Sequence, residues 1–266
     1  MIRNILALFA PIVLGACASA PMAPPAAVSD LAPTGKLRAI INFGNATLAR
    51  KDPVTGEASG VSVDMARELA KRLGVEAELV TVTSAGQSVE VLASGRVDVG
   101  FFAIDPARAA TTAFTGPYVQ IEGVYLVRND SPIRSNEEVD REGVRVVVGN
   151  KSAYDLYLTR TLKRAQLVRV PTSPEAIEIF LKDRLEAAAG VKQPLLQFAQ
   201  THPNVRVMEG RFMAIEQAMG TPRGREAGAL YLRGFVEEMK ASGFVARGLE
   251  KSGQGDAAVA LRAPVR

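Results

Sequence analysis

VEVLASGRVDV, at residues 89–99, is repeated in altered letters as IEIFLKDRLEA at residues 177–187, a constant offset of 88 residues. In both copies a short amphipathic helical pattern ends at a small or acidic residue and an arginine follows. Small and apolar residues then indicate a buried parallel strand. A helix–strand unit present twice in one chain predicts two similar α/β lobes. Because clefts between domains commonly bind small ligands, the repeat also predicts a ligand site between the lobes.

The composition is that of a globular protein with an ordinary core. Of the 266 residues, 47% are hydrophobic and 23% are charged, and the formal net charge is +4. The 32 basic residues are spread along the chain without a basic block, so we expect no nucleic-acid partner. A single cysteine and a single histidine exclude a Cys/His zinc cluster and a disulfide within the chain. We therefore expect no metal and no cofactor.

The N-terminus has the pattern of an export signal. Arg3 precedes an apolar run at residues 5–14, which suits the core of a signal peptide and is too short to span a bilayer. Leu14-Gly15-Ala16-Cys17 then resembles the bacterial lipobox, in which cleavage precedes the cysteine and the thiol is lipidated. An ordinary Ala-x-Ala cleavage near Ala18 or Ala20 is the alternative, and both cleavages take the protein out of the cytoplasm.

We accordingly expect a lipoprotein signal peptide at residues 1–17 and a periplasmic protein that Cys17 anchors to a membrane, inner or outer. Residues 18–34 are rich in alanine and proline, and we expect them to form an extended tether.

The folded body alternates strand and helix patterns, which predicts parallel sheets with right-handed crossovers. Strands are predicted at 37–43, 75–82, 97–103, 144–148, 167–170, 185–189 and 205–208, an extended segment at 122–127, and helices at 63–73, 87–93, 153–162, 174–181, 193–201 and 226–239. We assign residues 35–124 and 217–266 to the first lobe and residues 125–216 to the second. The two crossings between the lobes would form a hinge.

Asp105-Pro106-Ala107-Arg108 is the first candidate for ligand binding. Asp105 can cap a helix that begins at Pro106, which places Arg108 in the first turn beside free backbone N–H groups. A planar guanidinium next to a helix N-terminus suits a carboxylate held through two parallel hydrogen bonds.

In order and spacing, the motifs of residues 35–252 resemble those of the family 3 bacterial extracellular solute-binding proteins. The motifs are GKLR (35–38), TGE (55–57), GVSVDMA (60–66), LASGRVD (92–98), Arg108, FTGPY (114–118) and VG (148–149). The resemblance implies a type II periplasmic binding fold of the Venus-flytrap kind, with a mostly parallel sheet flanked by helices in each lobe. It also implies delivery of a solute to an ABC permease in the inner membrane.

Site residues follow from the resemblance position by position. In the family, the arginine at the place of Arg108 holds the α-carboxylate of the ligand. The family's stacking aromatic aligns with Asn45, although Phe43 and Phe102 could supply a ring nearby. On the second lobe, residues 149–152 begin a helix in the way the family uses to present backbone donors. The candidates on this lobe are Lys151, Ser152, Lys192 and Gln193.

Two positions depart from the family pattern. Asp105 stands where the family usually has a hydroxyl residue, and its charge could neutralise Arg108. The acid that usually pairs with the α-ammonium of the ligand is replaced by Val191, which argues against a standard α-amino acid.

We expect a monomeric lipoprotein of an ABC importer, without enzymatic activity, that binds a small polar carboxylate-bearing solute, amino-acid-like or an organic acid. One alternative is an enzyme on the same fold that resembles cyclohexadienyl dehydratases, for which Asp105 is the candidate acid or base. Another is an accessory or sensory lipoprotein that presents a ligand-dependent surface to a protein partner. The sequence leaves these alternatives open because one fold hosts many functions.

Overall fold

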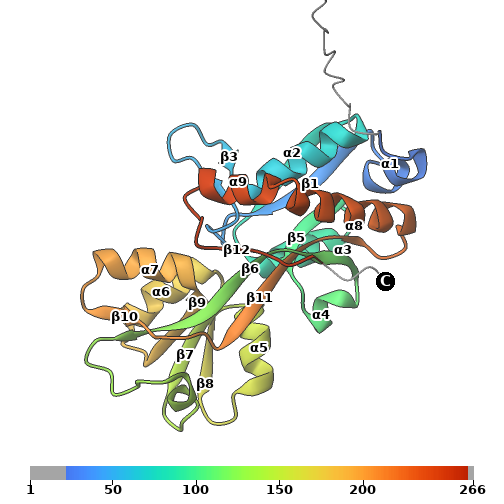
Figure 1. The fold of residues 1–266 in the computed structure, drawn as a ribbon. Coiled ribbons are helices and arrows are strands. Elements are labelled where there is room, and N and C mark those ends of the chain that lie inside the picture. Colours follow the sequence, from blue (N-terminus) through green and yellow to red (C-terminus); the bar gives the residue numbers. More distant parts are fainter. Residues whose placement is uncertain (1–21, 263–266) are drawn as a thin grey trace, which may run out of the picture.

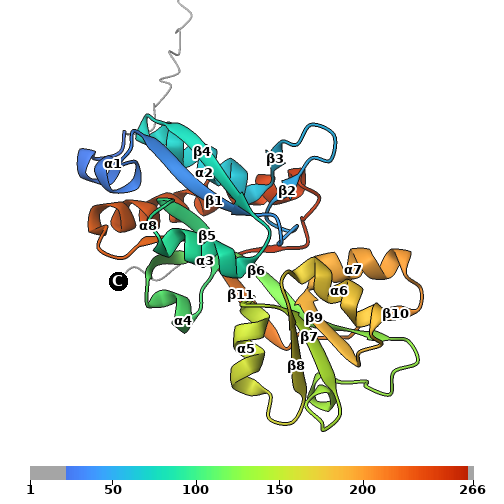
Figure 2. The same cartoon turned by 180° about the vertical axis from the view of Figure 1, so that it is seen from behind.

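The computed structural model describes residues 22–262, which form two lobes connected by two long strands (Figures 1 and 2). The helices are α1 (Pro25–Leu31), α2 (Val61–Leu73), α3 (Ala85–Ala93), α4 (Pro106–Ala109), the 3-10 helix η1 (Asn136–Val139), α5 (Ala153–Thr161), α6 (Ser173–Lys182), α7 (Lys192–Thr201), α8 (Glu226–Ala241) and α9 (Phe244–Lys251). The strands are β1 (Lys36–Asn42), β2 (Arg50–Lys51), β3 (Ala58–Ser59), β4 (Glu76–Val82), β5 (Val99–Ala103), β6 (Thr112–Arg128), β7 (Arg145–Gly149), β8 (Gln166–Val170), β9 (Ala187–Val191), β10 (Val205–Val207), β11 (Met213–Pro222) and β12 (Ala258–Val259). Within the described residues, no helix combines the length and the hydrophobicity needed to cross a membrane.

The two lobes share one strand order. In the first lobe β1 lies between β4 and β5 and pairs with both in parallel, and in the second lobe β7 lies between β8 and β9 in the same way. The repeated segments are α3 with β5 and α6 with β9, so they occupy the same place in each lobe. The prediction of two similar α/β lobes from the repeat is confirmed.

Two antiparallel strands carry the chain between the lobes. β6 has 17 residues and pairs along most of its length with β11. β11 also pairs with β5 of the first lobe, and β6 also pairs with β9 of the second, so one continuous ladder joins the two lobes. The expected lobe boundaries at 124–125 and 216–217 fall within these two strands, which run from one lobe to the other in Figure 1.

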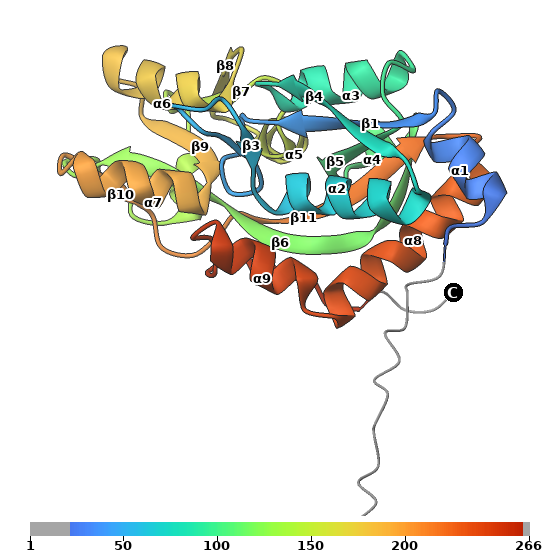
Figure 3. The same ribbon diagram turned by 90° about the horizontal axis from the view of Figure 1, so that it is seen from above.

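Apolar clusters cover both faces of the sheet. In the first lobe α2, α8 and α9 pack on one face, and Val91 and Leu92 of α3 pack on the other, in a cluster with Phe102 of β5 (Figure 3). In the second lobe α6 and α7 pack against the sheet around Phe180 and Leu195. The inner strands β7 (RVVVG) and β9 (AAAGV) accordingly consist mostly of small and branched apolar residues, whereas the outer strands β4 (EAELVTV) and β8 (QLVRV) also carry polar residues.

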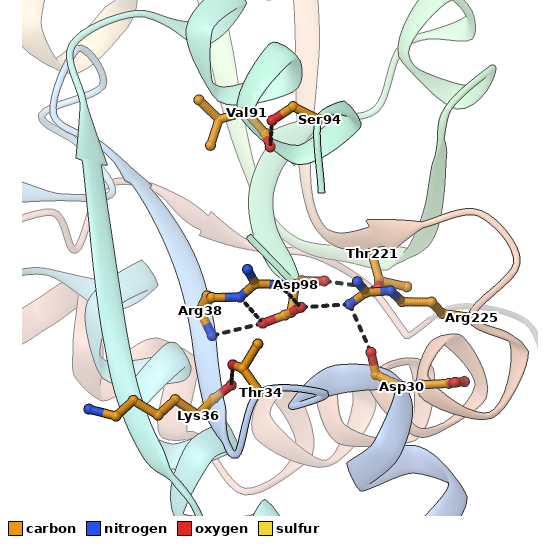
Figure 4. Close-up of polar contacts among 9 residues, drawn as sticks. All are labelled: Asp30, Thr34, Lys36, Arg38, Val91, Ser94, Asp98, Thr221 and Arg225. Carbon is orange, nitrogen blue, oxygen red and sulfur yellow. Dashed lines mark hydrogen bonds and ion pairs between the residues drawn. The ribbon is translucent and has the colours of Figure 1, made fainter. Parts of the chain in front are cut away.

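Each copy of the repeat fixes its strand through an arginine–carboxylate pair. Asp98, fully buried just before β5, accepts hydrogen bonds from the backbone N–H of Arg38 (3.1 Å) and from its Nε (2.9 Å) and Nη2 (2.8 Å) (Figure 4). Arg225 donates a further bond of 2.8 Å to the same carboxylate. In the second lobe Glu186 accepts the same three bonds from Arg145, each of 2.8 Å. The acidic position shared by the two sequence copies therefore performs one structural role twice.

Burial alone would raise the pKa of Asp98, but hydrogen bonds from Arg38 and Arg225 outweigh it and hold the pKa below its ordinary value. Hydrogen bonds from Arg145 likewise lower the pKa of Glu186.

The predicted tether at residues 18–34 is wrong for its second half, because residues 25–31 form helix α1, which packs on α8. Ala23, Ala27 and Leu31 recur at a spacing of four and are all buried, a helical period within the alanine- and proline-rich stretch. Asp30 accepts a hydrogen bond of 2.9 Å from the N–H of Gly228, which fastens α1 to the start of α8. The predicted signal peptide and Cys17 lie outside the described residues.

Candidate ligand-binding site

A cavity of about 220 Å³ lies between the two lobes. Its walls contain residues at or just beyond the carboxyl ends of all six parallel strands, among them Asn42, Ala85, Ala103, Ser152, Ser173 and Val191. Ile215 and Gln217 of the crossing strand β11 also line it. Ligands of open α/β sheets bind at the carboxyl ends of the strands, so the two lobes contribute equivalent edges to one site.

Arg108 contributes a buried guanidinium to this cavity. Its side chain is 5% exposed, and it donates hydrogen bonds to the carbonyl oxygens of Ala103 (3.1 Å) and Lys151 (2.8 Å). These bonds use two of the five N–H donors of the group. Burial lowers the pKa of Arg108 to about 10, and the nearby charge of Asp105 partly opposes this effect. Arg108 thus remains a cation at neutral pH, and an anion in the cavity would be attracted to it.

Asp105 does not line the cavity. One carboxylate oxygen caps α4 by accepting a hydrogen bond of 2.9 Å from the N–H of Ala107, and the other forms an ion pair of 2.8 Å with Arg160 of the second lobe. The cap predicted from Asp105-Pro106 is present. However, its carboxylate forms an ion pair with Arg160 and accepts no hydrogen bond from Arg108, so its charge acts on Arg108 only from a distance.

Three further candidates of the first lobe reach the cavity. Phe43, Asn45 and Phe102 all line it, so two aromatic side chains share the wall with Asn45, the position of the family's stacking aromatic. Phe102 also packs edge-on against Phe114, with ring centroids 6.4 Å apart. The Oδ1 atom of Asn45 is buried and lacks a hydrogen-bond partner within the described part of the chain. A buried acceptor without a partner suits a donor on a bound solute.

The candidates of the second lobe differ in whether they line the cavity. Ser152 lines the cavity and caps α5 by accepting a hydrogen bond of 3.1 Å from the N–H of Asp155. Lys151, Lys192 and Gln193 are not among the residues that line the cavity, and Lys192 forms an ion pair of 2.7 Å with Glu122. Lys151 has a positive φ of 57°, and its N–H is bound by Asp155 at 2.7 Å. Residues 149–152 were expected to offer backbone N–H donors to a solute, but the N–H of Lys151 is already hydrogen-bonded within the protein.

The sequence did not single out most of the second-lobe wall as binding residues. Tyr154, Ser173, Ile177, Pro194 and Leu195 line the cavity, and the Tyr154 hydroxyl is hydrogen-bonded to the Ser173 Oγ. The one feature that they share and that could have indicated a site is their position, because each lies on a helix that follows a parallel strand. Their side-chain types, mostly apolar, gave no indication of a site.

Contacts across the cleft hold the lobes together around the cavity. Lys151 Nζ forms an ion pair of 2.7 Å with Glu90 of α3, which adds to the Arg160–Asp105 pair and to the Arg108 bond with the Lys151 carbonyl. The described chain is thus in a closed arrangement, in which these contacts join the two lobes.

Comparison with known proteins identifies relatives along most of the chain. The family model for bacterial extracellular solute-binding proteins, family 3, matches residues 49–254. The glutamine-binding protein of Geobacillus stearothermophilus is 25% identical over 194 residues, which cover 71% of this chain and 73% of the relative.

Solved structures share the fold. The solute receptor for L-cysteine of Neisseria gonorrhoeae superposes with a TM-score of 0.75 at 23% identity, over 85% of this chain and 92% of that one. A mutant of ArgBP from T. maritima superposes with a TM-score of 0.74 at 22% identity, over 85% of this chain and 99% of that one. The ancestral amino acid-binding protein AncCDT-1, a precursor of cyclohexadienyl dehydratase, superposes with a TM-score of 0.72 at 23% identity, over 84% of this chain and 98% of that one. The expected two-lobed fold of type II periplasmic binding proteins is confirmed.

Proposed function

Because the chain belongs to the family 3 bacterial extracellular solute-binding proteins, we propose that it closes its two lobes around a small carboxylate-bearing solute and delivers it to an ABC permease. The family is extracytoplasmic, and the relatives are amino-acid-type solute-binding proteins of ABC transporters. One chain supplies both walls of the cavity, so the proposed binding unit is a monomer.

The observation that carries the proposal is the buried Arg108 in the cavity between the lobes. A guanidinium removed from water is unfavourable unless hydrogen-bond acceptors and an opposite charge compensate for its lost hydration. Backbone carbonyls satisfy two of its donors, but its nearest acid, Asp105, is engaged by Arg160. A bound carboxylate would supply both the missing charge and acceptors for the remaining donors.

An enzyme on this fold is not proposed. The dehydratase alternative requires an acid or base in the cavity, and Asp105 was its candidate. Since Asp105 lies outside the cavity wall and both of its oxygens are engaged, no observation at this residue favours turnover over binding.

We also propose that the protein is a membrane-anchored lipoprotein, on the basis of Leu14-Gly15-Ala16-Cys17. Acyl chains on Cys17 would each add about 0.8 kcal/mol of membrane affinity per buried methylene, enough for firm anchoring with several chains. A Cys17→Ser variant should move from the membrane fraction to the released periplasmic fraction, whereas Ser19→Ala should stay with the membrane. Membrane retention of the Cys17→Ser variant would reject lipid anchoring.

The binding proposal is tested by titrating wild-type protein and an Arg108→Met variant with a panel of amino acids, dicarboxylates and aromatic acids. The variant removes the charge but keeps an unbranched side chain. Arg96→Met serves as control because Arg96 is exposed in the turn between α3 and β5 and does not line the cavity. Loss of a charge-assisted pair should weaken binding by about 100-fold. Equal affinity of wild type and the Arg108→Met variant for every bound carboxylate would remove Arg108 from the site.

A further inference from the structure

The cavity between the lobes combines one cation with an apolar wall. Among the described residues that line it, Arg108 is the only one with a charged side chain, and none carries a carboxylate. Most of the others are aromatic, aliphatic or glycine residues, including Phe43, Phe101 and Leu195. The cavity therefore offers one positive charge in a wall that is otherwise neutral and mostly apolar.

An ammonium group on the solute would find no anionic partner in this wall. At the end of β9, where the second lobe meets the cavity, the side chain is Val191, and its neighbours in the wall include Ile177 and Pro194. The two buried acids that lie nearest in sequence to cavity residues, Asp105 and Asp155, are engaged elsewhere. Asp105 pairs with Arg160, and Asp155 accepts from the N–H of Lys151 and pairs with Arg169.

Neutral groups of the wall can serve a hydroxyl better than a cation. The buried Oδ1 of Asn45, which lacks a partner in the described chain, can accept one hydrogen bond from a solute O–H. An ammonium taken out of water needs a compensating negative charge as well as acceptors. Neutral side chains of the wall such as Ser62 and Gln217 can supply acceptors but not that charge, so an ammonium would lose affinity here.

The size of the cavity limits the apolar part of the solute. An apolar cavity of about 150 Å³ accepts a benzene molecule. The cavity here, at about 220 Å³, has room for one ring or one branched alkyl group together with a short carboxylate-bearing arm.

We propose that the solute is a monocarboxylate with an aromatic or branched apolar body and no ammonium group, such as a 2-hydroxy acid, and not an α-amino acid. This inference rests on the proposed function, since it assigns the substrate class of the same cavity. The carboxylate binds Arg108, the apolar body lies among the aromatic and aliphatic side chains, and the 2-hydroxyl donates to Asn45.

The test uses two pairs of probes in which only one group changes. L-3-phenyllactate and L-phenylalanine differ by a hydroxyl in place of the ammonium, as do L-2-hydroxy-4-methylpentanoate and L-leucine. Isothermal titration is performed on protein that has been unfolded, dialysed and refolded, so that no solute is carried through purification. We expect the hydroxy acid of at least one pair to bind on the order of 100-fold more tightly than its amino acid.

Each outcome bears on one of the two claims. If either amino acid binds as tightly as its hydroxy acid or more tightly, the inference about the solute is overturned while the binding proposal stands. If neither acid of either pair binds, the inference is also overturned. The proposed function is judged separately, by the response of the wider carboxylate panel to Arg108→Met.

A matched pair of variants tests the role of Val191. Val191 is the N-cap residue of α7, a position that favours both aspartate and asparagine, so Val191→Asp and Val191→Asn should both fold. Val191→Asp should raise the affinity for the amino acid relative to the hydroxy acid by at least about 10-fold, because it supplies a charge for the ammonium. Val191→Asn should leave the ratio within about 3-fold of wild type. Equal shifts in the two variants would contradict the electrostatic explanation.

Discussion

Replacing Asp98 with asparagine should destabilise the protein far more than the matched change in the other copy of the repeat. Asp98 is fully buried and accepts three hydrogen bonds from Arg38 and one from Arg225, at 2.8–3.1 Å. The Asp98→Asn variant would leave two guanidinium groups, each about one-fifth exposed, facing one another without an anion. Breaking such a buried pair lowers the free energy of unfolding by about 3–5 kcal/mol.

The matched control is Glu186→Gln. Glu186 accepts the same three bonds from Arg145, but the side chains of Glu186 and Arg145 are 29% and 40% exposed. Water can replace much of this interaction, so the expected loss is about 1 kcal/mol.

Thermal unfolding followed by circular dichroism compares the two variants directly. At about 3 °C per kcal/mol for a chain of this size, Tm should fall by about 10 °C for Asp98→Asn and by about 3 °C for Glu186→Gln. The greater burial of Asp98 makes its pair more important for stability than that of Glu186. Equal decreases of Tm in the two variants, or a decrease below about 3 °C for Asp98→Asn, would refute this argument.

Three other predictions concern acid stability, the N-terminal helix and the cleft. Because the folded pKa of Asp98 lies below its ordinary value near 4, its stabilisation is complete above that value and is lost as pH falls through the folded pKa. As pH is lowered below about 4, Tm should therefore fall more steeply in wild type than in the Asp98→Asn variant. Parallel curves of Tm against pH would exclude this contribution of Asp98. Leu31→Ala, at a fully buried position on α1, should lower the free energy of unfolding by about 2–4 kcal/mol in urea titration, whereas a free tether would give no change. Arg160→Met, which removes the pair with Asp105 across the cleft, should weaken solute binding several-fold and reduce its salt dependence in titration calorimetry, and unchanged binding would show that the pair does not support closure.

The fold could be predicted because the repeat and the apolar periods encode it locally. The helix–strand copies at 89–99 and 177–187 lie at equivalent places in the two lobes, and the helix predicted at 63–73 lies within α2. The 17-residue strand β6 was recognised only at 122–127, because its identity depends on pairing with β11, which is distant in sequence. α1 was missed because Pro24 and Pro25 suggested an extended segment. Pro25 is instead the first residue of the helix, where its missing N–H has no cost.

The candidate site could be predicted where a local motif carries it. Asp105-Pro106 specifies a helix start, and this places Arg108 at the cavity. The roles of Lys151 and Asp105 could not be foreseen, since their ion pairs with Glu90 and Arg160 exist only when the lobes meet. The same is true of the apolar wall of the second lobe. Apolar residues after a strand are typical of any core, and only the closed arrangement makes them part of a cavity.

The most direct test of the account is a crystal structure of the refolded protein with L-3-phenyllactate. The account predicts that the solute lies between the lobes, with its carboxylate within 2.7–3.1 Å of the Arg108 guanidinium and its ring against the apolar wall. A solute bound elsewhere on the surface, or a bound carboxylate that does not contact Arg108, would contradict it.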